Sequence, residues 1–175
     1  RNIASYFGFT RLEVQMLCDK FSMDSEEMVK WYDGYRIGRE VSMFNPSSVM
    51  QALYADQCDS YWQTTGAFDQ VATYIDMNFD GLKDDVIYML AGGRCSVDTT
   101  GFSNDMHDVR TKNDVFTVLI HLGYLSYNQE EHECFIPNKE VMGEMSHAVE
   151  SKRWRVAQSI NQSKQLLADT LAGDE

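Results

Sequence analysis

Apolar residues recur at helical spacing along much of the chain, and residues that favour helix starts precede several of these runs. Thr10 is a good N-cap, and Glu13 three residues later completes a capping box. The apolar stripe that follows consists of Val14, Leu17, Cys18 and Phe21. This pattern predicts a first helix that buries one face.

The stretch WYDGYRIG, residues 31–38, lies at the end of a second predicted helix, for which Asp24 is the N-cap. Gly34 occupies the position where a helix commonly ends with a left-handed residue. The apolar residues of one helical face are Met28, Trp31, Tyr32 and Tyr35. We expect Met28, Trp31 and Tyr32 to be buried together, so helix packing explains most of this stretch but not Arg36.

Further helix signals follow along the chain. Asn45 and Pro46 form an N-cap and first helical position. Three later helices are predicted from about Thr65, within 78–93 with a stop at Gly92-Gly93, and over 111–123, with inward residues Phe68, Val71, Ala72, Ile75, Leu82, Val86, Leu90, Val115, Phe116 and Leu119. A last helix begins after its N-cap Asn138.

Short strands are predicted between the later helices. The segments YLSYN and CFIPN flank the polar turn QEEH as a hairpin, and RCSVDTTGF alternates weakly, as a short strand would. The expected fold is therefore mainly α, a helical bundle followed by a winged-helix-like unit with a short β-hairpin. We expect a lid-like helical domain over 1–100, the winged-helix-like domain over 101–158, and a helical tail over 159–175 that leads toward an absent C-terminal domain.

Composition narrows the possible classes of function. The net charge of −12 disfavours general nucleic-acid binding, because an acidic surface repels phosphate backbones. The chain has neither a long apolar run nor a visible signal peptide, so we expect a cytoplasmic protein. Its cysteines are then free, buried thiols. Because the chain begins at Arg1 without a methionine, we interpret it as a piece of a longer protein.

Candidate chemistry is sparse in this sequence. The run DMNFDG at 76–81 matches the first half of a calcium loop, but Ile87 stands where a bidentate glutamate is needed. We therefore expect Asn78 or Asp80 to cap the next helix instead. The four histidines lack zinc-site spacing, and no phosphate-binding loop or nucleophile elbow occurs. We predict no catalytic residue, no metal site and no cofactor for this chain alone, which is not expected to be an enzyme.

The order of several motifs is distinctive when they are taken together. These motifs are YFGFTRLEV, KWYDGYRIG, MFNPSSVMQAL, SYWQTTG, LIHLGYLSY and FIPNKEV. Over about residues 1–150 the chain resembles the predicted AAA-ATPase-like family of bacterial proteins, common in gut anaerobes of the Bacteroides type. Members often carry a PD-(D/E)XK nuclease-like domain after the ATPase part. Two departures are YRIG in place of YRFG and NPSS in place of NPWS.

The resemblance implies a function for the parent protein. The Walker motifs that bind ATP and Mg²⁺ would precede Arg1, and this chain would be a non-catalytic regulatory or coupling fragment, a lid plus winged helix. Its partners would be the missing ATPase core and nuclease-like domain. Arg36 would then lie near the nucleotide, although we favour a local pair between Arg36 and Asp33. The alternatives are a winged-helix protein-interaction module or, less favoured, a DNA-binding module that uses Lys152, Arg153 and Arg155.

Overall fold

The computed structural model describes residues 8–37, 40–62, 75, 78–102 and 109–149. These residues form a mostly helical structure with two small three-stranded antiparallel sheets. The helices are α1 (Arg11–Phe21), α2 (Ser25–Tyr32), α3 (Pro46–Ala55), the 3-10 helix η2 (Phe79–Gly81), α5 (Leu82–Leu90), α6 (Lys112–His121) and α7 (Lys139–Val149). The strands are β1 (Phe9–Thr10), β2 (Tyr35–Ile37), β3 (Glu40–Phe44), β4 (Cys95–Ser96), β5 (Ser126–Asn128) and β6 (Glu133–Phe135).

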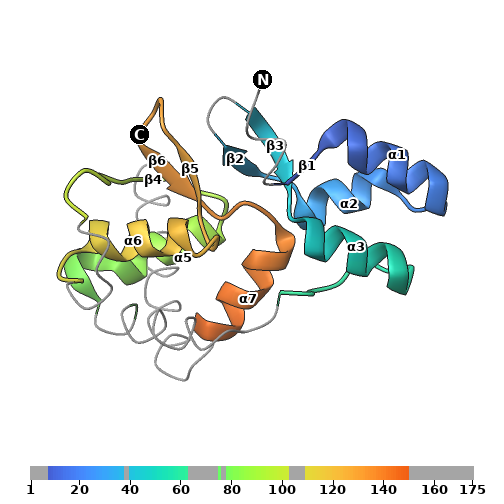
Figure 1. Ribbon diagram of the computed structural model, residues 1–175. Coiled ribbons are helices and arrows are strands. Elements are labelled where there is room, and N and C mark those ends of the chain that lie inside the picture. Colours follow the sequence, from blue (N-terminus) through green and yellow to red (C-terminus); the bar gives the residue numbers. More distant parts are fainter. Residues whose placement is uncertain (1–7, 38–39, 63–74, 76–77, 103–108, 150–175) are drawn as a thin grey trace, which may run out of the picture.

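The first unit, which we define as the described residues 8–61, packs α1, α2 and α3 with a sheet of order β1-β3-β2 (Figure 1). Its helices begin where the sequence predicts. Thr10 and Glu13 form the expected capping box, Asp24 accepts from two backbone N–H groups of α2, and Asn45 caps α3 ahead of Pro46. The buried core consists of Val14, Cys18, Met28, Tyr32, Phe44, Val49, Ala52 and Leu53.

The second unit, which we define as the described residues 62–149, packs α5, α6 and α7 with a sheet of order β4-β6-β5. The predicted hairpin is confirmed, with Tyr127 opposite Cys134 in the register of β5 and β6. Val115, Phe116 and Leu119 of α6 are fully buried, as expected. The Asn138 side chain caps α7 by accepting from the N–H of Val141 at 3.1 Å.

Several details differ from the sequence-based expectation. Tyr35 does not extend the apolar face of α2, because the helix ends at Tyr32 and Tyr35 opens strand β2. Phe21 remains 41% exposed, and in α5 Met89 is buried while Leu90 is only partly so. The helix expected from Thr65 and the tail over 159–175 lie outside the described residues, apart from the buried Ile75.

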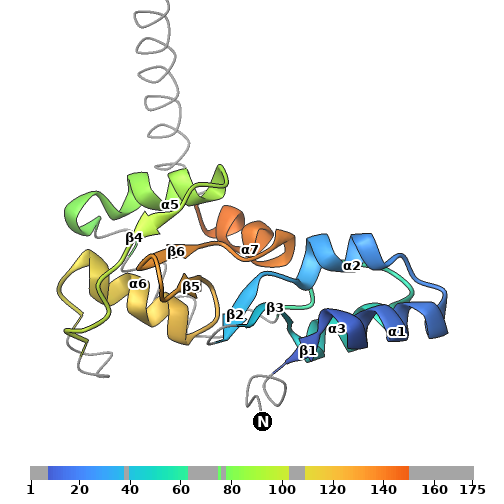
Figure 2. The same cartoon turned by 90° about the horizontal axis from the view of Figure 1, so that it is seen from above.

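The described hydrophobic core consists of two clusters that divide between Tyr61 and Trp62, except that Tyr35 packs against the second cluster. Helix α5 packs in the second cluster, although the expected lid-like domain extends to residue 100. The division into domains therefore stays a prediction. Figures 1 and 2 show α1–α3 on one side, α5 and α6 on the other, and α7 between them. None of the described helices has the length and apolar character that a bilayer crossing requires.

Candidate functional site at the junction of the two units

Residues 31–36 connect α2 to β2 and lie where the two units meet; we call them the junction segment. Strand β2 is the edge of the first sheet and β5 is the edge of the second. The two edges lie side by side in both views (Figures 1 and 2). An uncovered edge strand can pair with another chain, so this contact covers one edge of each sheet while it joins the units.

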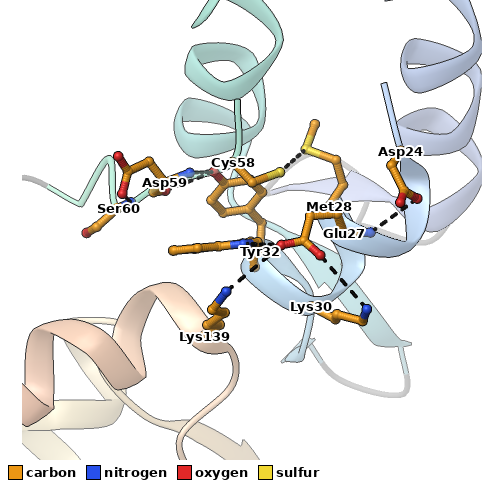
Figure 3. Close-up of polar contacts among 10 residues, drawn as sticks. Asp24, Glu27, Met28, Lys30, Tyr32, Cys58, Asp59, Ser60 and Lys139 are labelled. Carbon is orange, nitrogen blue, oxygen red and sulfur yellow. Dashed lines mark hydrogen bonds and ion pairs between the residues drawn. The ribbon is translucent and has the colours of Figure 1, made fainter. Parts of the chain in front are cut away.

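Trp31 forms the first contact of the junction segment with α7. Its indole N–H donates to Glu27 Oε1 at 2.8 Å, and Lys139 Nζ lies 3.9 Å from the same oxygen and 4.1 Å from the Trp31 ring centroid. Figure 3 shows Lys139 reaching from α7 toward Glu27. Trp31 is half-buried, whereas Met28 and Tyr32 are fully buried. The expectation of common burial is therefore correct for Met28 and Tyr32 and wrong for Trp31, whose ring covers a contact between units.

Tyr32 holds the chain that leaves α3. Its hydroxyl donates to the carbonyl oxygen of Asp59 at 2.9 Å and accepts from the Asp59 N–H at 3.0 Å (Figure 3). Burial raises the pKa of the Tyr32 phenol far above its usual range. The hydroxyl therefore stays protonated and can both donate and accept at this site.

Asp33 does not pair with Arg36, contrary to the local role favoured from the sequence. Its carboxylate accepts from the Ser42 hydroxyl at 2.8 and 3.0 Å and from the Gly34 N–H at 2.6 Å. Residues at i and i+3 face each other on a helix, but α2 has already ended and the chain is extended here. The Asp33 carboxylate therefore stabilises the turn and the β2–β3 hairpin and does not pair with Arg36.

Gly34 allows a close backbone approach between the units. Its φ is +106°, the positive value expected for this residue, although the C-cap of α2 is already Asp33, in an extended conformation. A Cβ added at this position would lie 2.1 Å from the carbonyl oxygen of Pro137, just before α7. The sequence pattern explains the backbone angle, but it gives no signal for the contact with Pro137.

Tyr35 and Arg36 extend the junction along the strand edges. The Tyr35 hydroxyl donates to the carbonyl oxygen of Gly123 at 3.1 Å, and the Arg36 N–H donates to the Ser126 hydroxyl at 3.1 Å. Burial raises the pKa of Tyr35 well above its usual range. Within the described part of the chain, no ion pair or hydrogen bond engages the Arg36 guanidinium. The backbone of Arg36 is thus fixed while its charged end is left unpaired there.

Glu140, in the first turn of α7, is a fully buried acid at the same junction. Its Oε1 accepts from the Tyr61 N–H at 2.8 Å. Burial raises the pKa of Glu140, although the hydrogen bond from the Tyr61 N–H favours the charged form. The side chain therefore links α7 to the segment that joins the two units. An acid in the first turn of a helix gives no sequence signal of burial, because such positions are usually exposed.

A cavity of about 420 Å³ opens beside the junction segment. It lies between the β2–β3 hairpin, the start of α3 and strand β5, and its walls include Tyr35, Arg36, Phe44, Trp62, Leu125 and Ser126. A smaller cavity of about 330 Å³ shares Asn45 and Trp62 with it. Arg36, whose guanidinium has no described partner, therefore lines a mostly apolar hollow, which makes this the candidate site of the chain.

The other sequence candidates do not converge on this cavity. The N-cap of α5 is Gly81 and not Asn78 or Asp80, so that expectation is wrong, although Asn78 accepts from the Lys83 N–H at 3.0 Å. Asp76 lies outside the described residues. His121 and His132 lie in separate parts of the fold, on α6 and on the β5–β6 turn, and His107 is not described. The four cysteines are free thiols, three of them buried. In the described ranges no cluster of three metal-ligating side chains occurs.

Searches against protein-family models, curated proteins and solved structures gave no match for this chain. The family expected from the order of motifs thus stays a prediction. The junction segment and its cavity are the features that bear on the function.

Proposed function

We propose that this chain is a non-catalytic coupling module of a larger AAA-type ATPase. The observation that carries the proposal is the junction segment, whose successive residues contact α7, the turn before β5 and β5 itself. Because these contacts are short and largely shielded, the two units are expected to move as one body. Such a body can transmit the nucleotide state of an ATPase core to whatever the second unit contacts.

The arrangement of the second unit supports a winged-helix interpretation. Helix α5, strand β4, helix α6 and the β5–β6 hairpin follow one another in the chain, and the sheet order is β4-β6-β5. A helix followed by a closing β-hairpin is how a winged-helix unit ends, and α6 with β5 and β6 has this order. In the proposal this unit is the docking part and the first unit is the lid.

Arg36 is the residue that we assign to the nucleotide side of this module. Its backbone N–H is hydrogen-bonded to Ser126, and no described residue forms an ion pair or hydrogen bond with its guanidinium. An arginine held in this way can stabilise phosphate charge on ATP and Mg²⁺ bound by a separate core. The earlier alternative, a local pair with Asp33, is removed by the contacts of that carboxylate with Ser42 and Gly34.

Protein docking is favoured over DNA binding for the second unit. Helix α6, the segment that would read a major groove, is buried from Val115 to Leu119, and its Lys112 is engaged by Asp85 at 2.6 Å. The β5–β6 turn carries Glu130 and Glu131, which would repel phosphates. An electrophoretic shift with duplex DNA, titrated with salt, separates the two: salt-sensitive binding would favour the DNA alternative.

The test compares Arg36 variants in the parent protein and in this chain. Arg36→Ala and Arg36→Lys should reduce ATP turnover of the parent, the former by a factor of about ten or more. Melting of this chain should stay unchanged, because no described partner is lost. Arg94→Ala is the matched control, since Arg94 is an exposed arginine that pairs with Glu131 and Glu133. Equal turnover in Arg36→Ala and Arg94→Ala would refute the assignment.

A further inference from the structure

We propose that the cavity beside Arg36 binds a small amphipathic anion, a flat apolar body that carries one carboxylate, sulfonate or phosphate group. This inference goes beyond the proposed function and does not rest on it, because it concerns a site on this chain alone. A ligand held there would contact both units and could act as an effector of the junction.

The size and walls of the cavity define the body of the ligand. A volume of about 420 Å³ lies within the range of small-molecule sites, roughly 300–1,000 Å³. The walls are formed largely by apolar side chains, among them Met43, Phe44, Trp62, Ile120 and Leu125. The partly exposed Trp62 offers a ring surface, which suits a flat aromatic body, while Phe44 lies buried behind the wall.

The charge of the ligand follows from the charged side chains among the described residues that line the cavity. The chain has 27 acidic and 15 basic residues, yet its described lining residues include Arg36 and neither aspartate nor glutamate. A cation without a carboxylate partner in such a wall attracts a single negative charge. A cation would find no counter-charge among these residues, and a neutral ligand would leave the guanidinium without an ionic partner there.

Two amide side chains can complete the recognition of an anion. Asn45 uses its Oδ1 to accept from the Ser47 N–H at 3.0 Å, so its Nδ2 group remains a possible donor. Gln129 is exposed at the edge of the cavity and also carries an amide donor. Together with Arg36 these groups give the anionic end of a ligand several hydrogen-bond donors, while the apolar walls hold its body.

A pair of fluorescent probes tests the proposal on the whole chain. The anionic probe is 1-anilinonaphthalene-8-sulfonate, and N-phenyl-1-naphthylamine is its neutral analogue with the same aromatic body. We expect saturable one-to-one binding of the anionic probe, which Arg36→Met should weaken about tenfold while the affinity of the neutral probe stays within about twofold. Arg94→Met, with an exposed arginine removed elsewhere, should change neither affinity.

A second variant and a competition series complete the test. Gln129→Glu adds a negative charge at an exposed position and should weaken only the anionic probe, even if Arg36→Met were poorly folded. Indole-3-acetate and phenyl phosphate, used as competitors, distinguish a carboxylate ligand from a phosphate ligand, and displacement by either supports the site. The proposal would be overturned if Arg36→Met, Gln129→Glu and Arg94→Met all bound the anionic probe as the unmodified chain does, or if neither competitor displaced it.

Discussion

Replacement of Gly34 by alanine tests the idea that the junction segment holds the two units together. The substitution adds one methyl group and leaves every charge and hydrogen-bonding group in place. In the structure this methyl would lie 2.1 Å from the carbonyl oxygen and 2.8 Å from the carbonyl carbon of Pro137. Since both atoms belong to the backbone, no side-chain rotation can relieve the overlap.

The expected cost has two physical sources. Alanine at a φ of +106° is strained, and a left-handed residue with a Cβ costs about 1–2 kcal/mol. The overlap with Pro137 requires the two units to move apart by about 1 Å, and overpacking of this kind costs about 1–3 kcal/mol. We therefore expect Gly34→Ala to lower the free energy of unfolding by about 3 kcal/mol.

A second glycine separates the two sources. Gly92, after α5, has a φ of +90°, and nothing lies within 4 Å of the Cβ that alanine would add. Gly92→Ala should therefore show the backbone strain alone. We expect Gly34→Ala to cost about 2 kcal/mol more than Gly92→Ala, which corresponds to a further fall in Tm of roughly 4–8 °C for a chain of this size. Equal midpoints of urea and thermal unfolding for the two variants would show that the junction is not packed as described.

Three further predictions concern the same region. Trp31→Ala should cost about 2 kcal/mol in urea unfolding, less than for a fully buried tryptophan, since the ring is half-buried; a cost below about 0.5 kcal/mol would contradict its contact with Lys139. Burial raises the pKa of Glu140 in the folded chain above its ordinary value, so its contribution to stability is present at low pH and is lost as pH rises through the folded-state pKa. The free energy of unfolding of Glu140→Gln minus that of the unmodified chain should thus increase with pH, and a constant difference would refute the role of burial. Calorimetry of this chain with Mg-ATP should show no binding, because no phosphate-binding loop occurs in it, and micromolar binding would contradict this.

The helices of this chain are largely predictable because their start signals are local. Thr10 with Glu13, Asp24, Asn45 and Asn138 each cap a helix as expected, since a cap depends on residues within a few positions along the chain. The hairpin of β5 and β6 is predictable for the same reason: its turn and its apolar alternation lie within a short segment.

The junction is not predictable in this way because its contacts join residues far apart in sequence. Tyr35 continues the helical spacing of Met28 and Tyr32, but the helix ends at Tyr32 and Gly34 changes the chain direction. The apolar spacing therefore predicts a helical position for a residue that lies in a strand. The burial of Glu140 and the approach of Gly34 to Pro137 depend on how α7 docks on α2, about which neither local sequence carries a signal.

The same geometry explains why Arg36 is the residue that sequence reasoning could not place. An acid three positions before an arginine suggests a local pair, but that spacing brings side chains together only while the chain is helical. After Gly34 the chain is extended, Asp33 is engaged by Ser42, and the Arg36 backbone is attached to Ser126 in the other unit. Arg36 therefore lies at the contact between two sheet edges and lines the cavity. A ligand that binds Arg36 would therefore contact the first unit at a residue whose backbone is hydrogen-bonded to the second unit.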